Sequence, residues 1–475
     1  MDQQHILLLP LMCHGHMIPT VEMAKLFASR GVKTTFITSP GLAEPIQKAR
    51  DSGSDIGIII IKFPPEGSGL PDHIVSVDQL TSDELVSGFV KALCLIQEPV
   101  EKVIQELRPT CLVADMFLTW TVDTAAKFGI PRLVFHGTGY LSLCALDKMK
   151  RHKPFKNVSS DSEPFVLPDL PHQLEFVRSQ VADFDLMENG NDFSKLIQKT
   201  RESDWRSYGV VVNSFYELEP DYADHYRKVL GRKAWNIGPL FLCNDGDEAK
   251  AARGKKSLID GHECLVWLDS KKPNSVVYVC FGSMATFSPS QLHEIAGGLE
   301  ASGQDFIWVV RKSKNKDENE EWQPHGFVDR TKDRGLIIQG WAPQVMVLDH
   351  PAIGAFVTHC GWNSTLEGVC AGVPLVMWPL FAEQFFNEKL VTEVLRIGVP
   401  VGSKKWQPMG SEGVPGEALA KAVQLVMAGQ SALEMRSRAK YYKEMARKAV
   451  EEGGSSYNDL SALIEDLSAY RPPRN

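Results

Sequence analysis

The sequence lacks a long hydrophobic run. Hydrophobic residues make up 43% of the 475 positions, but no stretch approaches the roughly 18 consecutive apolar residues that a membrane-spanning helix needs. The first apolar stretch, residues 6–9, is not preceded by basic residues and runs directly into Pro10, which is unlike a secretory signal. We therefore expect a cytoplasmic protein without an integral membrane segment.

Positive charge is also scarce. Lys and Arg number 51 against 59 Asp and Glu, which gives a net charge of -8. A protein that binds nucleic acid through its phosphates usually carries the opposite balance, so we expect no nucleic-acid partner. A small anionic ligand needs only a local positive site and is compatible with this composition.

Paired cysteines and the common nucleotide-binding glycine motifs are missing as well. The nine cysteines are odd in number and widely spaced, and no C-x-x-C occurs, so we expect reduced thiols. The first predicted strand is not followed by G-x-G-x-x-G, and G-x-x-x-x-G-K-S/T is absent. These absences argue against a nicotinamide-dependent oxidoreductase and a P-loop enzyme.

What the sequence does contain is two runs of alternating strands and helices. Parallel strands joined by helices, with a polar segment at 243–257 between the two runs, predict an α/β protein of two doubly wound domains. Residues 150–200 read as irregular, with short helical pieces. The expected strands are 5–12, 32–38, 111–114, 132–135 and 209–214 in the first run, and 275–281, 306–310, 336–339, 353–358 and 374–377 in the second. The expected helices include 19–30, 81–105, 119–128 and the segment 416–470, and the one that follows strand 275–281 begins with a capping box at Ser288 and Gln291.

In the second run, one strand is followed by a segment suited to an anion. Ligands of open parallel sheets bind beyond the carboxyl ends of the strands. After strand 353–358, a helix is expected to begin near Asn363, and its free N–H groups suit a diphosphate. The side chains of His359, Asn363 and Ser364 can add donors, and Glu367 can accept from ribose hydroxyls. The competing interpretation is an ordinary helix start, with Ser364 and Glu367 as a capping box.

Loops after neighbouring strands can supply the other contacts of a nucleotide sugar. The indole of Trp341 can stack on a base, and the nearby amide of Gln344 can contact polar edges. The adjacent carboxylate and amide of Glu383 and Gln384 suit sugar hydroxyls, and Ser283 follows a further strand. Residue types at several strand ends, rather than one motif, therefore indicate a nucleotide-sugar site.

In the first run, His16 follows the first strand and precedes the expected helix. Its neutral imidazole can take a proton from a hydroxyl, although a lone histidine at a strand end is more often structural. Asp115 follows strand 111–114 and can orient the imidazole; alternatively it caps the next helix. His14 completes an H-x-H, but no third ligand lies nearby, so we expect no metal. The two D-x-D triplets, 183–185 and 245–247, are interpreted as surface.

Four motifs between Trp341 and Gln384, W-A-P-Q, H-C-G-W-N-S-T-L-E, G-V-P and E-Q, resemble the signature box of the plant secondary-product UDP-glycosyltransferases, at that family's spacing. The resemblance extends over the whole chain and is closest to the branch that glucosylates phenolics. It implies the GT-B fold, in which two Rossmann-like domains face each other across a cleft. The implied domains are an acceptor domain at 1–242, a linker at 243–257, a UDP-sugar domain at 258–455 and a helix at 456–475 that returns to the first domain.

The resemblance also assigns roles to residues. By position, the family places uracil on Trp341 and Ala342, ribose on Gln344 and Glu367, diphosphate on Ser283, His359, Asn363 and Ser364, and the sugar on Trp362, Glu383 and Gln384. In the family, a closing Gln with Trp at the position of Trp362 usually accompanies glucose. Glu383 departs from the commonest family residue, Asp, but keeps the carboxylate.

The family's base falls on His16 and its orienting carboxylate on Asp115. The implied reaction is an inverting transfer from UDP-glucose, a co-substrate, to an acceptor hydroxyl. It gives a β-glucoside and needs no cofactor or metal. The acceptor pocket is expected to be lined by the stretch 180–200 and by Ile18, Phe117, Trp120, Thr138, Phe381 and Ala382.

An apolar pocket suits small hydrophobic hydroxylated metabolites. Phenylpropanoids, coumarins and flavonoids are expected first, and a steroid or triterpenoid acceptor is the alternative. A non-catalytic nucleotide-sugar-binding protein is a distant alternative. We expect a monomer.

Overall fold

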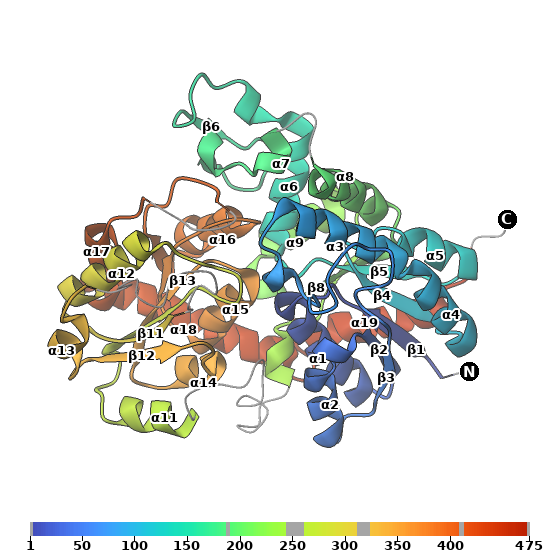
Figure 1. Cartoon of the computed structure of the whole chain (residues 1–475), viewed down its shortest axis with the longest axis horizontal. Helices are drawn as coiled ribbons and strands as arrows, with labels where there is room; N and C mark the ends of the chain where they lie inside the picture. The colour runs from blue at the N-terminus through green and yellow to red at the C-terminus, as the bar shows by residue number, and fades with distance from the viewer. Residues whose placement is uncertain (1–2, 187–190, 244–260, 311–323, 408–412, 473–475) are drawn as a thin grey trace.

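The structure is a computed structural model that describes residues 3–186, 191–243, 261–310, 324–407 and 413–472. Figure 1 shows two lobes side by side, each built on a sheet with helices packed around it. The two sheets are entirely parallel. The predicted pair of doubly wound α/β domains is therefore confirmed.

The first sheet has seven strands in the order β3-β2-β1-β4-β5-β8-β9. Its strands are β1 (His5–Leu9), β2 (Lys33–Thr38), β3 (Ile56–Ile60), β4 (Cys111–Asp115), β5 (Arg132–Phe135), β8 (Gly209–Val212) and β9 (Ala234–Asn236). The order reverses between β1 and β4, which are neighbours in the sheet. Such a reversal opens a crevice at the carboxyl ends of the two strands, and His16 and Asp115 lie there.

The second sheet repeats this plan with six strands, in the order β12-β11-β10-β13-β14-β15. Its strands are β10 (Val276–Cys280), β11 (Asp305–Val310), β12 (Gly335–Gln339), β13 (Ile353–Thr358), β14 (Leu375–Met377) and β15 (Gly398–Pro400). Here the order reverses between β10 and β13, which places Ser283 and His359 beside the second crevice.

Helices cover both sheets, and a small antiparallel hairpin, β6 (Pro164–Val166) with β7 (Glu175–Val177), lies outside them. The first lobe holds α1 (His14–Ser29), α2 (Glu44–Asp51), α3 (Asp83–Leu95), α4 (Gln97–Leu107), α5 (Thr121–Phe128), α6 (Tyr140–His152), α7 (Asp183–Leu186), α8 (Asp192–Trp205) and α9 (Pro220–Asp224). The second holds α11 (Gly261–Asp269), α12 (Pro289–Ser302), α13 (Phe327–Thr331), α14 (Gln344–Asp349), α15 (Trp362–Ala371), α16 (Gln384–Lys389), α17 (Gly416–Met427) and α18 (Gln430–Val450).

The last helix, α19 (Ser455–Ala469), packs on the first lobe rather than the second (Figure 1). Its buried leucines Leu460, Leu463 and Leu467 join the apolar core around β1. Ion pairs of Arg227 with Asp459 and of Lys233 with Asp466 add to this contact. At α19 the chain therefore returns from the second lobe to the first.

Several sequence expectations need correction. Helix α1 begins at His14, five residues before the expected start, and includes Pro19. The expected helix 81–105 is two helices, α3 and α4. Residues 192–200, expected to be irregular, belong to the continuous helix α8. The linker 243–257, apart from Cys243, and the triplet 245–247 lie outside the described residues.

The capping box at the start of α12 forms only in half. The Ser288 hydroxyl accepts from the N–H of Gln291 at 3.2 Å. The Gln291 side chain, however, bonds the backbone N–H and C=O of Val414, at 3.2 and 2.8 Å. A buried amide that finds two backbone partners on a neighbouring segment does not return to its own helix start.

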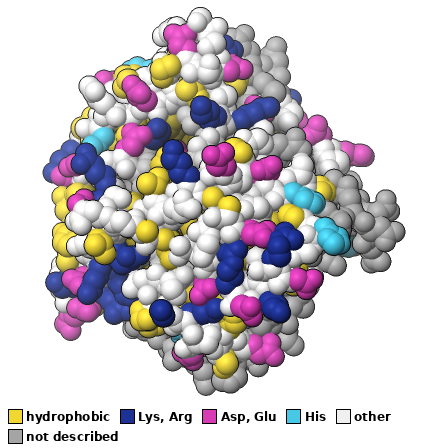
Figure 2. Space-filling view, turned by 90° about the vertical axis from the view of Figure 1, so that its left-hand side faces the viewer, with side chains coloured by type: hydrophobic (Ala, Val, Ile, Leu, Met, Phe, Trp, Pro, Cys, Tyr) yellow, Lys and Arg dark blue, Asp and Glu magenta, His cyan; other side chains and the backbone are white. Residues whose placement is uncertain are grey.

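Two surface observations bear on the expected partners. The face shown in Figure 2, which is the left-hand side of Figure 1, carries acidic and basic side chains interspersed and no extended basic stripe. Among the described residues, no helix is long and apolar enough to cross a membrane.

Candidate active site

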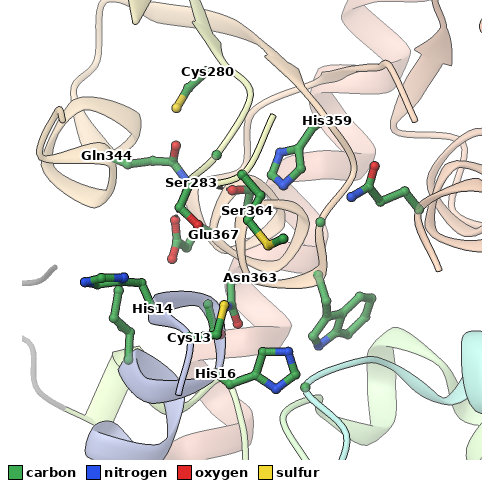
Figure 3. A pocket seen from close by; sticks show the side chains of 18 of the residues that line it. Cys13, His14, His16, Cys280, Ser283, Gln344, His359, Asn363, Ser364 and Glu367 are labelled. Carbon is green, nitrogen blue, oxygen red and sulfur yellow. Dashed lines mark hydrogen bonds between the residues drawn. The ribbon is translucent and has the colours of Figure 1, made fainter. Parts of the chain in front are cut away.

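Two cavities lie between the lobes, and His16 lines both. The first cavity, about 240 Å³, is lined by α1 and by the loops after the strands of the second sheet (Figure 3). The second cavity, about 280 Å³, is lined by α6, α7, α8 and α16 and by the loops after β4 and β5. Gly137, Ala382 and Glu383 also line both. A group transferred from one cavity to the other would therefore pass His16.

The first cavity brings together every residue that the sequence assigned to the UDP-sugar. These residues are Ser283, Trp341, Ala342, Gln344, His359, Trp362, Asn363, Ser364, Glu367, Glu383 and Gln384. Ile18 and Phe381, expected on the acceptor side, line this cavity instead of the second one. Ile18 comes from the start of α1 in the first lobe, and Phe381 comes from the loop between β14 and α16 in the second.

On one wall of the first cavity, three polar side chains hold each other in place. The Gln344 amide donates to the Ser364 hydroxyl at 3.0 Å and to the Glu367 carboxylate at 2.6 Å, and Figure 3 shows the three side by side. The alternative capping box is not formed, because Gly361 is the N-cap of α15 and no side chain caps it. Paired side chains of this kind are pre-set to receive hydroxyls.

The His359 imidazole is held between two glycines. A Cβ on Gly282 would lie 2.5 Å from the ring, and one on Gly361 would lie 2.4 Å from it. Gly282 also has φ +72, which L side chains rarely adopt. The ring therefore lies beside the N-terminus of α15, where an N–H-rich helix start and an imidazole can share an anion.

Asn363 ties the two lobes together at the site. Its amide donates to the Gly15 carbonyl at 2.7 Å. Inside a helix, that carbonyl would accept from the N–H of residue 19, but Pro19 has none. The proline that the sequence suggested as the helix start therefore lies inside α1 and leaves a backbone acceptor for the other lobe.

Trp362 is a contact between the lobes rather than an exposed ring. Its indole N–H donates to the Asn213 carbonyl at 2.7 Å, so this N–H is not available to a sugar. A Cβ on Gly139 would lie 2.5 Å from the Trp362 ring. The close approach explains why the first lobe has a glycine here.

The loop with Glu383 and Gln384 is shaped by its own amide. The Gln384 oxygen accepts from the N–H groups of Leu380 and Phe381, at 2.8 and 3.0 Å. Its NH₂ is then the group that it can offer to a sugar hydroxyl. Burial raises the pKa of Glu383, although hydrogen bonds and the charge of His16 partly offset this effect.

His16 and Asp115 form a close pair. The His16 Nδ1 lies 2.6 Å from Asp115 Oδ2, and the other Asp115 oxygen accepts from the N–H of Phe117 at 3.0 Å. Asp115 is the last residue of β4 and not the N-cap of α5, which is Trp120. His16 lies in the first turn of α1, not before it. Its Nε2 remains the nitrogen that can take a proton.

The electrostatic surroundings strengthen this base. Burial lowers the pKa of the His16 imidazole, but the charge and hydrogen bond of Asp115, together with the charge of Glu383, raise it. The net result is a pKa above the ordinary value for histidine. A partly exposed imidazole on a fully buried carboxylate is the arrangement of a general base.

The second cavity receives only part of the expected acceptor set. Phe117, Thr138 and Ala382 line it. Trp120 is not among the lining residues of either cavity, because its indole donates to the Leu93 carbonyl at 2.8 Å and packs in the first core. Asp185, interpreted as surface, is only 10% exposed at its side chain and lines this cavity.

Two groups of cavity residues escaped the sequence analysis. One face of α8 lines the second cavity, and beyond the expected stretch 180–200 it contributes Arg201 and Asp204. Phe385 and Phe386 line it from α16. The signal for the first group was present: Phe193, Ile197, Thr200, Arg201 and Asp204 share one helical face.

Among the described residues, no cluster of three or more His, Cys, Asp or Glu could hold a metal ion. His14 lies 3.5 Å from Asp78 without a third ligand.

The cleft presents an activated imidazole between a polar and an aromatic cavity, within two facing doubly wound domains. This combination is typical of a sugar-nucleotide-dependent transferase.

Comparison with known proteins agrees with the assignment of this cleft to a sugar-nucleotide-dependent transferase. The family model described as UDP-glucoronosyl and UDP-glucosyl transferase matches residues 76–434. The chain is 60% identical to the scopoletin glucosyltransferase of Nicotiana tabacum over 99% of both chains. It is 55% identical to the UDP-glucose flavonoid 3-O-glucosyltransferase 7 of Fragaria ananassa, over 98% of this chain and 96% of the other.

A solved structure of UGT73P12 from Glycyrrhiza uralensis, complexed with glycyrrhetinic acid 3-O-monoglucuronide, matches with a TM-score of 0.92 and 42% identity, over 98% of this chain and 96% of that one. The chain belongs to the UDP-glycosyltransferase family and has the GT-B fold. It is a glycosyltransferase, as the resemblance implied.

Proposed function

We propose that this enzyme transfers glucose from UDP-glucose to a hydroxyl of a small hydrophobic aromatic acceptor, with inversion at the anomeric carbon. The observation that carries the proposal is the His16–Asp115 pair at the boundary of the two cavities. The relatives named for scopoletin and flavonoids support the acceptor class, and Gln384 beside the sugar position supports glucose.

In this mechanism, UDP-glucose occupies the first cavity, with uracil on Trp341 and ribose against Gln344 and Glu367. The diphosphate lies at the N-terminus of α15 beside His359 and Ser283. The acceptor occupies the second cavity with one hydroxyl at His16. These roles are the ones that the family resemblance implies, and the presence of the side chains along the two cavities supports them.

The chemical step needs one proton transfer. His16 Nε2 takes the hydroxyl proton while the oxygen attacks the anomeric carbon from the face opposite UDP, and the bond to UDP breaks. The imidazolium that forms is stabilised by Asp115, which keeps its charge. The departing diphosphate is stabilised by the N–H groups of the α15 N-terminus and by His359. The products are a β-glucoside and UDP. None of the residues in this scheme acts as a metal ligand.

The test is UDP release from UDP-glucose with coumarins, flavonols, simple phenols and triterpenols, with EDTA present and without added metal. We expect turnover on the phenolic acceptors and a β-linked product by NMR coupling constants. His16→Ala should lower kcat by about 10²- to 10⁴-fold. His152→Ala, a partly exposed surface histidine, is the matched control.

Other results would change the proposal in defined ways. Turnover only on triterpenols would keep the mechanism and move the acceptor class, in line with the ligand of the Glycyrrhiza uralensis structure. UDP-glucose binding without turnover on any acceptor would favour a non-catalytic binding protein. Activity abolished by EDTA would contradict the metal-free scheme.

A further inference from the structure

The second cavity contains an ion pair that the transfer reaction does not use. Arg201 on α8 and Asp185 on α7 bond at 2.9 Å, and their side chains are 19% and 10% exposed. Both line the cavity. Removing an ion pair from water costs free energy, so such a pair often adds little to the stability of the fold. Its position in a binding cavity therefore suggests that it contacts a ligand.

A row of aromatic rings leads from His16 through Phe117 and Phe193 to Phe184, which directly precedes Asp185 in the chain. The Phe117 ring is 6.1 Å from the His16 ring, and Phe193 stacks on Phe117 at 6.0 Å. Phe193 and Arg201 lie on the same face of α8, eight residues apart, which is about 12 Å along the helix. A single phenol ring is too short to reach both ends, whereas linked aromatic rings can do so.

The charges around the cavity define what the far end can bind. The acidic side chains that line it are Asp147, Asp185, Asp204 and Glu383, and the basic ones are Lys150, Arg201 and Arg232, together with His16 and His136. Asp147 bonds Arg151 at 2.9 Å, and Arg232 bonds Asp204 at 2.8 Å. Because acidic and basic groups are mixed along the lining, a carboxylate or an ammonium group on the ligand would meet groups of its own sign. A hydroxyl can accept from the Arg201 guanidinium and donate to the Asp185 carboxylate at once.

We propose that the Arg201–Asp185 pair recognises hydroxyl groups on a second ring of the acceptor, and thereby selects polyhydroxylated multi-ring acceptors and fixes which hydroxyl reaches His16. This inference rests on the proposed function of the cleft. It deepens that function, because it names the part of the acceptor that the enzyme reads far from the transferred oxygen.

The test uses three flavonols that differ only in the hydroxyls of the pendant ring: galangin with none, kaempferol with one and quercetin with two. The measured quantity is kcat/KM for products formed at hydroxyls that all three share. For the unmodified enzyme, we expect a quercetin-to-galangin ratio of about tenfold, which corresponds to hydrogen bonds with charged groups. In Arg201→Met, the ratio should fall toward one, with galangin turnover retained within about twofold of the unmodified enzyme.

Asp185→Asn should lower the same ratio and keeps the shape of the side chain, so it serves if Arg201→Met does not fold. Product analysis should also show a broader mixture of regioisomers from quercetin in both variants. Arg206→Met is the matched control, because Arg206 lies just after α8 and pairs with Asp123 on the surface, 57% exposed.

Equal loss on galangin and quercetin in both variants would show that the pair is structural, and this result would overturn the inference. A ratio near one in the unmodified enzyme would overturn it as well, while glucosylation itself would leave the proposed function intact. Failure of the enzyme to glucosylate any flavonol, coumarin or simple phenol would instead contradict the proposed function.

Discussion

The two cavities of the cleft are built differently. The first is formed largely by one stretch of chain, 341–384, together with the loop after β10 and the start of α1. Its polar groups are already bonded to each other or to backbone, as the Gln344–Glu367 contact shows. The second is assembled from helices and loops between residues 116 and 232, with α16 across the cleft.

The contrast shows where specificity can vary in this fold. Backbone turns fix the first cavity, so its ligand groups tolerate little change. Side chains on helix faces form the second, so a single substitution there alters its shape without disturbing the sheet. We expect changes in the first cavity to affect UDP-glucose and changes in the second to affect the acceptor.

The largest effect should come from the pair that joins the two cavities. Asp115→Asn removes the charge that stabilises the imidazolium and should lower kcat by about 10²- to 10³-fold. KM for UDP-glucose should change little, since Asp115 is not among the residues that line either cavity. Steady-state kinetics with both substrates measures this split, and Asp123→Asn on the exposed side of α5 is the control.

The pH dependence of kcat/KM should differ between the unmodified enzyme and Asp115→Asn. His16 must be neutral to act, so kcat/KM should rise with pH as the imidazole loses its proton, with a midpoint above the ordinary pKa of histidine. Without the Asp115 charge, burial remains and lowers the pKa of His16, so the midpoint should move to lower pH. An unchanged midpoint would contradict the assignment of His16 as the titrating base.

An intermediate effect should come from the glycine that admits His359. Gly282→Ala places a methyl group 2.5 Å from the ring and should raise KM for UDP-glucose about tenfold or more, because the imidazole must leave the diphosphate position. KM for the acceptor should stay within about twofold.

Gly303→Ala separates this clash from backbone strain. Gly303 has φ +71, nearly the same as Gly282, but a Cβ there meets nothing within 4 Å. If both variants lose the same affinity for UDP-glucose, measured by calorimetry, the loss comes from backbone strain and not from His359.

The smallest effect should come from an aromatic contact between the lobes. Trp406 meets the edge of Phe184 at 5.8 Å, and Phe184 in turn contacts Phe193 at 6.2 Å. Trp406→Ala should raise KM for the acceptor about three- to tenfold, since one such aromatic contact is worth about 1 kcal/mol. Calorimetric binding of UDP-glucose should not change.

Trp406→Phe keeps a ring against Phe184 and should restore most of the acceptor affinity. A rise in the UDP-glucose Kd equal to the rise in acceptor KM would show that Trp406 holds the whole cleft together. That outcome would weaken the distinction between the two cavities.

The sequence predicted some of these features well and others poorly, for identifiable reasons. Most strands of the two sheets were predicted to within about three residues, because buried strands of parallel sheets are short apolar runs. The short edge strands β9 and β15 were not predicted. The start of α1 was misplaced because a proline is often the first residue of a helix. Here Pro19 lies inside the helix, and because it has no N–H, the Gly15 carbonyl is left to accept from Asn363 of the other lobe. Trp120 was assigned to the acceptor because sequence position does not show which way an indole points.

The sequence alone determined the two doubly wound domains, the polar groups after their strands and the order of the donor-side motif. These depend on local periodicity and on contacts between residues close in the chain. Only the tertiary structure decided that His16 and Asp115 meet at 2.6 Å, and that α8 turns Arg201 toward Asp185 inside the second cavity. Such contacts depend on how distant helices and sheets pack, and no local pattern of residues specifies that packing.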